Sequence, residues 1–409
     1  MKRIIPALIA IALILLVLAG SFGVKLLERF SYSDEKQNLE EYYGLSEGDQ
    51  GSVAIVLQNE KIDTQAKLID GRCYMEIEDV QALLNERFYY DKNESLLIYT
   101  TPTQKIVSGV GTNAYSVDGS DNTTDYTISV AEGDSLYIAL DYIKQYTNFS
   151  YELFTEPNRM QLRTQWGSRE SASIKKTTNL RVKGGVKSPI LREVAEAETV
   201  TILEEMETWT KVKTSDAMIG YVENKFLIER MTEEEIAVTD YEVPEYTSIH
   251  RDYKINLGWH AVYTESGNDT FDSVVNGTGT MNVISPTWFF LDGDEGDIKA
   301  IPSHSYVEKA HSRNMEVWAL LEDITLESNT YEVLSYTSRR ENLIRNLMNY
   351  VLEYNIDGIN IDLEGINYES GEHFTQFLRE LSIACRLNEV VLSVDNYVPR
   401  ESTAFYNRK

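Results

Sequence analysis

Three polar side chains alternate with aliphatic ones in a short stretch near the C-terminus. In residues 358–364, Asn360, Asp362 and Glu364 stand two positions apart, and isoleucine or leucine fills the positions between them. Because the side chains of a β-strand point alternately to its two faces, the three polar groups are predicted to share one face. Buried carboxylates are costly unless they are paired or hydrogen-bonded. The row therefore indicates a barrel strand whose polar face meets a wet, reactive cavity at its C-terminal end.

The two carboxylates of this row suit the hydrolysis of a glycosidic bond. A glycosidase needs a carboxylic acid that protonates the leaving oxygen, and Glu364 is the candidate for that role. The Cα of Asp362 is expected about 6–7 Å away, which predicts a hydrogen bond to Glu364 or like-charge repulsion that raises the pKa of Glu364. Most glycosidases place their two acids on different strands, so a pair on one strand favours a substrate-assisted route.

The part of the chain that positions this row, residues 251–409, alternates between strand and helix patterns. Its candidate strands lie at residues 254–262, 283–291, 316–321, 358–363 and 390–394. Its candidate helices lie at residues 306–313, 339–354 and 371–387. Alternation of this kind predicts parallel strands and a TIM-type α/β barrel. A complete barrel takes about 250 residues, so we expect a C-terminally truncated barrel that lacks its last three βα units.

Residues 357–364 read Asp-Gly-Ile-Asn-Ile-Asp-Leu-Glu and resemble the fourth-strand signature of glycoside hydrolase family 18, Asp-Gly-x-Asp-x-Asp-x-Glu. Segments similar to the second, third and fifth strands of that family, in its spore-cortex and cell-wall branch, lie at residues 285–289, 315–320 and 392–399. The resemblance implies that Glu364 acts first as acid and then as base. It implies that Asp362 orients the 2-acetamido group of the substrate, whose carbonyl oxygen attacks the anomeric carbon. The substrate would then carry an N-acetylated sugar, and the reaction would retain configuration.

Asn360 departs from that signature, which has an aspartate at this position. An asparagine can still hydrogen-bond to Asp362, but it cannot share or store a proton. It also removes one like charge from the row, which should favour an ionised Asp362. Asp357 faces the other side of the strand, and we expect Asp357 and Gly358 to be structural residues at the strand entry.

Three residues are candidates for substrate binding: Asn360, Trp288 and Asn396. Trp259, Trp288 and Trp318 are all candidate sugar platforms, and Trp288 is preferred because it lies near the end of the second predicted strand. Aromatic residues of barrel strands are more often part of the core. A core position is therefore the alternative for all three tryptophans.

The N-terminal residues 1–27 form a candidate membrane anchor or signal segment. Lys2 and Arg3 precede an uncharged run of about 21 residues, which would span about 31 Å as a helix and could cross a bilayer. The basic pair places the N-terminus in the cytoplasm and the bulk of the protein outside the cell. Signal peptides have shorter apolar regions of about 7–15 residues, which favours a single-pass anchor in the cell membrane. Cleavage near Ala19 would instead make the protein secreted.

Between this segment and the barrel region lie two further modules and two linkers. Residues 28–50 and 231–250 are polar and acidic and are predicted linkers. Residues 51–166 contain an internal repeat, with copies at residues 71–99 and 135–163, in which a strand, a short helix and a hairpin follow one another. The repeat resembles the stalk-like domain named after the N-terminal domain of copper amine oxidases. The resemblance implies an α+β spacer or interaction module and no copper.

Residues 172–230 resemble a bacterial SH3 domain. Short alternating strands are bounded by turn residues, as around Gly184 and Gly185, which a small all-β barrel requires. Members of that family often bind cell-wall peptides or polymer, so the resemblance implies binding to the cell wall. A module that only braces the neighbouring domain is the alternative.

The composition argues against some classes of partner and cofactor. The formal net charge is -27, which excludes nucleic acid as the expected partner because phosphate binding requires basic patches. The five histidines show no metal-ligand spacing, and no CxxC or HExxH motif occurs, so no metal or other cofactor is expected. Cys73 and Cys385 fall in different predicted domains, so no structural disulfide is expected.

Together these features predict a multidomain, exported glycoside hydrolase held at the cell membrane. Its substrate would be a β-linked polymer that contains N-acetylglucosamine, with peptidoglycan as the first choice and chitin as the alternative. A non-catalytic carbohydrate-binding or wall-scaffold protein is the second hypothesis, but the presence of both Asp362 and Glu364 favours the enzyme. An Asp-x-Glu pair that serves only a polar network or binds a cation is a third interpretation.

Overall fold

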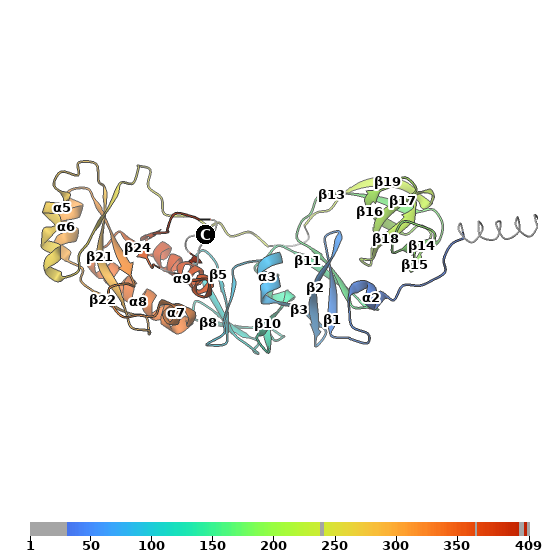
Figure 1. The fold of residues 1–409 in the computed structure, drawn as a ribbon, viewed down its shortest axis with the longest axis horizontal. Helices are drawn as coiled ribbons and strands as arrows, with labels where there is room; N and C mark the ends of the chain where they lie inside the picture. The colour runs from blue at the N-terminus through green and yellow to red at the C-terminus, as the bar shows by residue number, and fades with distance from the viewer. Residues whose placement is uncertain (1–30, 238–240, 365, 401–404, 407–409) are drawn as a thin grey trace, which may run out of the picture. The chain divides into compact units, whose positions relative to one another are not determined.

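The computed structural model describes residues 31–237, 241–364, 366–400 and 405–406. The chain divides into two compact units (Figure 1). The first unit combines the residues up to 75 with residues 139–241, and the second combines residues 76–138 with the residues from 242 onward. The predicted membrane segment, residues 1–27, lies outside the described residues. Within the described ranges, no helix is long and apolar enough to cross a membrane.

A seven-stranded antiparallel sheet of the first unit forms an SH3-like module. Its strand order is β15-β14-β18-β17-β16-β13-β19. The strands are β13 (Ser168–Ile174), β14 (Thr178–Arg181), β15 (Ile190–Val194), β16 (Thr199–Glu205), β17 (Trp209–Thr214), β18 (Ile219–Glu223) and β19 (Leu227–Glu234), with the 3₁₀ turn η1 (Asn224–Phe226) before the last. Inward-facing apolar side chains, among them Leu180, Val200, Val212 and Val222, form its core. The prediction of a small all-β domain in this region is confirmed.

The remaining strands of the first unit belong to the region predicted as a stalk. β1 (Ser52–Leu57) pairs antiparallel with β2 (Glu60–Ile69) and parallel with β12 (Arg159–Arg163). β3 (Arg72–Glu76) pairs with β2, and β11 (Ser150–Phe154) pairs with β12. The helix α2 (Leu39–Tyr43) precedes this sheet. Its N-cap Asn38 accepts the backbone N–H of Glu41, and Gly44 ends it in the left-handed conformation.

The internal repeat has the predicted succession of elements in both copies. The first copy runs from β3 through the short helix α3 (Ile77–Leu83) to the hairpin of β4 (Phe88–Asp91) and β5 (Leu96–Thr100). The second runs from β10 (Ser135–Ala139) through α4 (Leu140–Ile143) to the hairpin of β11 and β12. The likeness of residues 51–166 to the copper amine oxidase domain stays a prediction.

The β-rich part of the second unit is an antiparallel meander of five strands. β4 and β5 continue into β6 (Lys105–Gly109), β7 (Ala114–Val117) and β8 (Ser120–Thr123), each paired with the strand before it. Outside this meander, β9 (Ser129–Glu132) pairs antiparallel with β10. These strands lie within the range predicted as a single stalk domain, but they pack in the same unit as the predicted barrel region.

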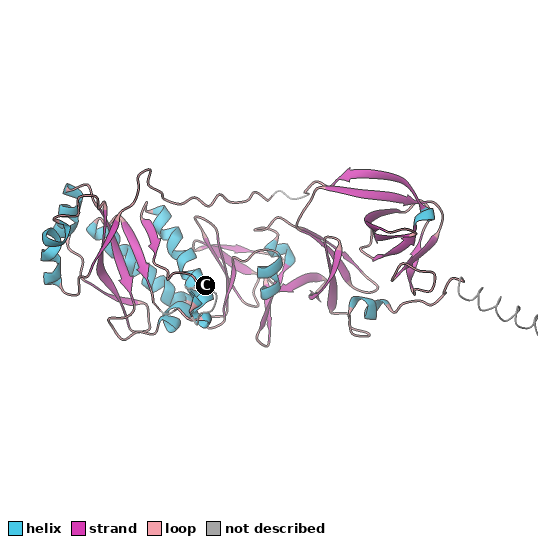
Figure 2. Cartoon of the chain, turned by 45° about the horizontal axis from the view of Figure 1, so that its top comes forward, coloured by secondary structure: helices cyan, strands magenta, loops and turns pink. Residues whose placement is uncertain are grey.

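A parallel sheet with helices around it forms the rest of the second unit (Figure 2). Its order is β20 (Leu257–His260), β21 (Val283–Asp292), β23 (Glu316–Glu322), β24 (Gly358–Asp362) and β25 (Val391–Val394), and β22 (Asp297–Ala300) pairs antiparallel with β21. The connections contain η2 (Glu265–Thr270), α5 (Phe271–Val275), α6 (His304–Ser312), α7 (Thr330–Ser335), α8 (Thr337–Tyr354) and α9 (Tyr368–Leu387). The strands run parallel, follow one another in chain order and are joined by helices. This is the βα succession that the sequence predicts. The assignment of this sheet to a C-terminally truncated TIM-type barrel stays a prediction.

Local sequence signals explain the helices that flank β24. α8 buries Leu343, Leu347 and Val351, which are spaced at the helical period, and ends at Asn355 with φ 55°. α9 begins at the N-cap Asn367, whose side chain accepts the backbone N–H of Ser370. Both helices therefore end or begin within a few residues of β24, which fixes the strand between them.

A buried ionic network joins the meander to these helices. Arg340 of α8 is fully buried, and its Nη2 lies 3.1 Å from Oε1 of Glu380 on α9. Lys105 of β6 reaches the other oxygen of Glu380 at 3.2 Å. Asp91 of β4 accepts the backbone N–H of Thr337, at the start of α8, at 2.6 Å. Because buried charges are stable only when paired, this network ties the strands after residue 76 to the helices of the α/β region.

Candidate active site

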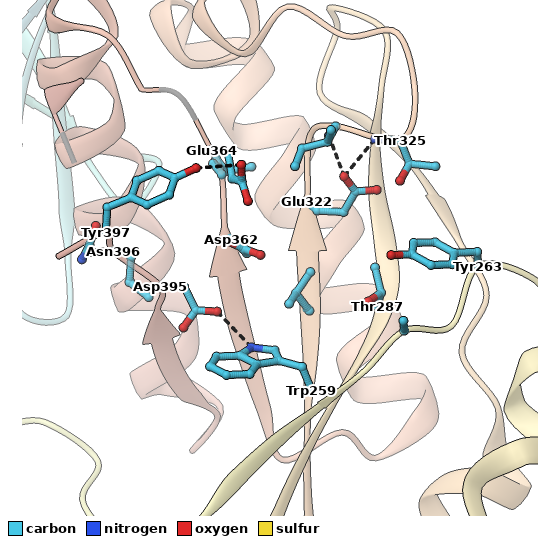
Figure 3. A pocket seen from close by; sticks show the side chains of 15 residues that line it. Trp259, Tyr263, Thr287, Glu322, Thr325, Asp362, Glu364, Asp395, Asn396 and Tyr397 are labelled. Carbon is cyan, nitrogen blue, oxygen red and sulfur yellow. Dashed lines mark hydrogen bonds between the residues drawn. The ribbon is translucent and has the colours of Figure 1, made fainter. Parts of the chain in front are cut away.

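A cavity of about 760 Å³ opens at the C-terminal ends of the parallel strands (Figure 3). In the described part of the chain, four carboxylates from three different strand ends line it: Glu322 of β23, Asp362 of β24, Glu364 in the loop after β24, and Asp395 after β25. No lysine or arginine is among the described residues of its lining. Such a cavity repels anions and admits uncharged polar or cationic ligands.

β24 presents Asp362 and Glu364 to this cavity, as the alternation predicts. Ile359 and Ile361 are buried in the hydrophobic core and do not line the cavity, whereas Leu363 belongs to the core and also lines the cavity. The strand ends at Asp362, so Glu364 belongs to the loop after it and is exposed. The period of two residues along the strand thus decides which side chains face the ligand space.

Two neighbours hold Glu364 in place. The hydroxyl of Tyr397, which follows β25, donates to Oε2 of Glu364 at 2.7 Å (Figure 3). The backbone N–H of Glu364 donates to Oδ1 of Asp323 at 3.1 Å. Asp323 also accepts the hydroxyl of Thr330, and burial raises the pKa of Asp323. The loops after β23 and β25 therefore position this carboxyl group from two sides.

Asp362 titrates well above the ordinary range of an aspartate. Burial, and next the nearby charge of Asp395, raise the pKa of Asp362 to about 6. Smaller repulsions of the same sign come from Glu364, Asp323 and Glu322. Asn360 adds no charge of its own, so the prediction that it leaves Asp362 more readily ionised than an aspartate would stays a prediction. Asp395 on the neighbouring strand supplies a negative charge that opposes this ionisation.

Asn360, predicted to bind substrate, instead hydrogen-bonds to neighbouring side chains and is not among the residues that line the cavity. It is fully buried, and its Nδ2 donates to Oδ2 of Asp395 at 2.8 Å and to Oγ of Ser285 at 3.4 Å. The predicted hydrogen bond to Asp362 is absent from the bonds of the described residues. Parallel pairing of β24 with β25 places Asp395 within reach of this amide, and the sequence motif alone does not contain that information.

Glu322 supports the wall opposite Asp395. It pairs in register with Asp362 across β23 and β24 and is 5% exposed. Its Oε2 accepts the backbone N–H groups of Ile324 and Thr325 at 2.5 and 2.9 Å. A carboxylate that accepts two backbone donors fixes the turn after β23, and this turn forms the side of the cavity seen next to Tyr263 in Figure 3.

The tryptophan that the sequence favours as a sugar platform is buried, and a different one is exposed in the cavity. Trp288 is fully buried, and its Nε1 donates to Oδ1 of Asn268 at 2.7 Å, so the prediction of a sugar platform at Trp288 is wrong. Trp318 is also in the core, 4% exposed. Trp259 is 62% exposed, lines the cavity and donates its Nε1 to Oδ2 of Asp395 at 3.1 Å (Figure 3). Trp259 therefore offers an exposed aromatic face in the cavity, as does Tyr263, which is 61% exposed.

Asp357 and Gly358 lie at the entry of β24, away from the cavity. Oδ2 of Asp357 accepts hydrogen bonds from Nε2 of His311 and from the backbone N–H of Val317, both at 2.8 Å. A Cβ atom at Gly358 would lie 2.7 Å from Cδ1 of Trp318 in the adjacent strand, so this position has room only for glycine. Asn396 lines the cavity and is exposed, and its role in substrate binding stays a prediction.

Sequence reasoning missed Asp395, Tyr397, Glu322 and Asp323. All four lie at the C-terminal ends of β23 and β25 or directly after them. Functional groups of parallel α/β sheets collect at these ends, so the strand predictions alone could have nominated them. As for metals, the residues that the structure describes contain no group of His, Cys, Asp or Glu arranged to hold an ion.

Comparisons with known proteins identify one module and a set of similar folds. Residues 176–228 match the family described as bacterial SH3 domain. No curated protein matches the chain in sequence.

Solved structures similar to this chain include chitinases and spore cortex-lytic enzymes. The C-terminal domain of a protein assigned as a chitinase in Desulfitobacterium hafniense DCB-2 is 22% identical, with a TM-score of 0.34 over 38% of this chain and 49% of that chain. A chitinase from Chromobacterium violaceum ATCC 12472 is 15% identical, with a TM-score of 0.33 over 38% and 50%. The Bacillus cereus spore cortex-lytic enzyme SleL is 17% identical, with a TM-score of 0.32 over 43% and 42%. The match thus spans about half or less of each of these structures.

Proposed function

We propose that this chain is part of an exported glycoside hydrolase that cleaves a β-linked polymer containing N-acetylglucosamine. The observation that carries the proposal is that Glu364 and Asp362 line the same cavity, and that the hydroxyl of Tyr397 donates a hydrogen bond to Glu364. The resemblance of residues 357–364 to the fourth-strand signature of glycoside hydrolase family 18 supports the same reaction. Peptidoglycan is the favoured polymer, and chitin is the alternative.

The proposed reaction uses the acetamido group of the substrate as the nucleophile. Glu364 protonates the glycosidic oxygen while the acetamide oxygen attacks the anomeric carbon, which breaks the bond to the leaving sugar. Asp362, when ionised, accepts the acetamide N–H and holds the group under the ring. Glu364 then removes a proton from water, which opens the cyclic intermediate from the opposite face. Two inversions give net retention of configuration.

The other parts of the site fit this substrate. The exposed indole of Trp259 offers a flat apolar face to a sugar ring, and the absence of lysine and arginine from the described lining suits a neutral sugar. The SH3-like module is proposed to hold the enzyme on the cell wall. Export through residues 1–27, as a membrane anchor or a cleaved signal, completes the proposal.

A non-catalytic carbohydrate-binding protein is the second candidate. Trp259 and the cavity alone would serve such a protein, so the test must separate binding from cleavage. The full-length protein is incubated with purified peptidoglycan and with N-acetylglucosamine oligomers, and new reducing ends are measured. We expect release by the wild type, and a loss of at least about a hundredfold in Glu364→Gln.

The matched control is Glu353→Gln, which removes an exposed carboxylate of α8 and should keep full activity. Binding of the oligomers without release of reducing ends, in wild type and variants alike, would leave the binding protein as the correct function.

A further inference from the structure

Asp395 connects the first and the last strand of the parallel sheet. β20 and β25 are the two ends of the order β20-β21-β23-β24-β25, which would set them about 19 Å apart in a flat sheet at about 4.8 Å per strand. Here the sheet curves enough that Trp259, in β20, donates to Asp395, directly after β25. One side-chain hydrogen bond thus spans the cavity between these two strands (Figure 3).

The carboxylate of Asp395 is itself held by the strand beside it. Its Oδ2 accepts both the Trp259 indole and the Nδ2 of Asn360, at 3.1 and 2.8 Å. Its backbone N–H donates to the carbonyl of Ile361 at 2.8 Å. An oxygen with two donors at a fixed backbone position keeps its place, so Asp395 can determine where the indole lies.

The charge of Asp395 acts on Asp362. The acidic groups that face Asp362 are Glu364 on its own strand, Asp323 and Glu322 at the end of β23, and Asp395 after β25. Tyr263 and Tyr397 are the neutral titratable groups of the cavity, and no cation lines it among the described residues. Of the four acids, Asp395 acts most strongly on Asp362.

We propose that Asp395 is a positioning residue with two separable actions: its oxygen holds the Trp259 indole as a platform, and its charge repels the charge of Asp362. The proposal rests on the proposed function for its kinetic consequences. The hydrogen bonds and the charge exist in the free protein, so they can also be tested without a substrate.

Three variants separate the two actions. Asp395→Asn keeps an oxygen that accepts from Trp259 and Asn360 but removes the charge, so the acid limb of kcat/KM against pH should move down by about 0.5–1 unit while KM stays unchanged. Asp395→Ala removes the accepting oxygen and the charge. It should therefore move the acid limb in the same way and also raise KM about tenfold. Trp259→Phe should raise KM without moving the acid limb, and combining it with Asp395→Ala should raise KM no further than Asp395→Ala alone.

Asp252→Asn is the control, because it removes an exposed carboxylate of the same unit outside the cavity. An acid limb that stays in place in Asp395→Asn overturns the action through charge. Fully additive changes of KM in the double variant overturn the action on the platform.

A measurement on the free protein keeps this inference apart from the proposed function. The indole N–H resonance of Trp259, identified by its loss in Trp259→Phe, should shift further in Asp395→Ala, which loses the acceptor, than in Asp395→Asn, which keeps a neutral one. The side-chain carboxyl resonance of Asp362 should titrate at lower pH in both. If these shifts occur in a protein that cleaves no glycan, the proposed function fails and the positioning role stands. If cleavage occurs and the resonances are unaffected, only the positioning role fails.

Discussion

The hydroxyl of Tyr397 donates to the carboxyl group of Glu364 at 2.7 Å, across 33 positions of the chain. The bond joins the loop after β25 to the loop after β24, so it depends on the pairing of these two strands. It gives the exposed Glu364 side chain one orientation toward the cavity.

Loss of this bond should slow catalysis more than it weakens binding. Tyr397→Phe removes only the hydroxyl, and we expect kcat to fall about tenfold with little change in KM, because this bond orients the carboxyl group of Glu364 and a hydrogen bond contributes about 0.5–1.5 kcal/mol. Steady-state kinetics on N-acetylglucosamine oligomers measure both constants. Tyr354→Phe, which keeps the ring stacked on His304, is the matched control, and an equal fall there would remove the specific role of Tyr397.

The activity should decline as the pH falls through about 6. Asp362 must be ionised to accept the acetamide N–H, and its pKa is raised to about 6 by burial and by Asp395. Protonation of Asp362 below that pH therefore removes the acceptor. The dependence of kcat/KM on pH for the wild type checks this, and an acid limb near the ordinary aspartate pKa of 3.8 would contradict it.

The same carboxylate should destabilise the fold at neutral pH. The pKa of Asp362 is higher in the folded state than its ordinary value of 3.8, so folding favours the protonated form. The stabilising contribution of the protonated Asp362 is fully present below about pH 4 and is lost as the pH rises through about 6. Asp362→Asn should therefore raise Tm by about 2–4 °C at neutral pH and change it little at about pH 4. Thermal unfolding at the two pH values measures the difference.

Trp288 and Trp259 should respond to substitution in opposite ways. Trp288→Ala opens a cavity in the core and leaves Oδ1 of Asn268 without its donor, which should lower the free energy of unfolding by about 3–5 kcal/mol. Trp259→Ala removes an exposed side chain and should leave that free energy within about 0.5 kcal/mol while KM rises. Denaturant titration and kinetics on the two variants would show the reverse pattern if Trp288 were the platform.

The buried pair of Arg340 and Glu380 should matter for stability and not for chemistry. Arg340→Leu leaves Glu380 buried with Lys105 as its remaining cation, and we expect a loss of about 3 kcal/mol. The double variant Arg340→Leu with Glu380→Leu should lose less free energy of unfolding, because it contains no uncompensated buried carboxylate at position 380. Denaturant unfolding of both variants tests this, and equal losses would show that the charge pairing is unimportant.

Much of the fold follows from local patterns of the sequence. The alternation around Asp362 and Glu364 determined which face of β24 meets the cavity, because the side-chain period of a strand is two whatever surrounds it. The apolar spacing of Leu343, Leu347 and Val351 determined the buried face of α8. The alternating strands of residues 172–230 likewise predicted the SH3-like module, which the family match at residues 176–228 supports.

The tertiary structure decided the composition of the site. Asp395 and Tyr397 reach Asn360 and Glu364 only through the parallel pairing of β25 with β24, which no local pattern encodes. β21 is buried along nearly its whole length, so alternation could not tell that Trp288 faces the core. Sequence periodicity reports the environment of one element, whereas the partners across a sheet, and with them the pKa of Asp362, depend on which elements pack together.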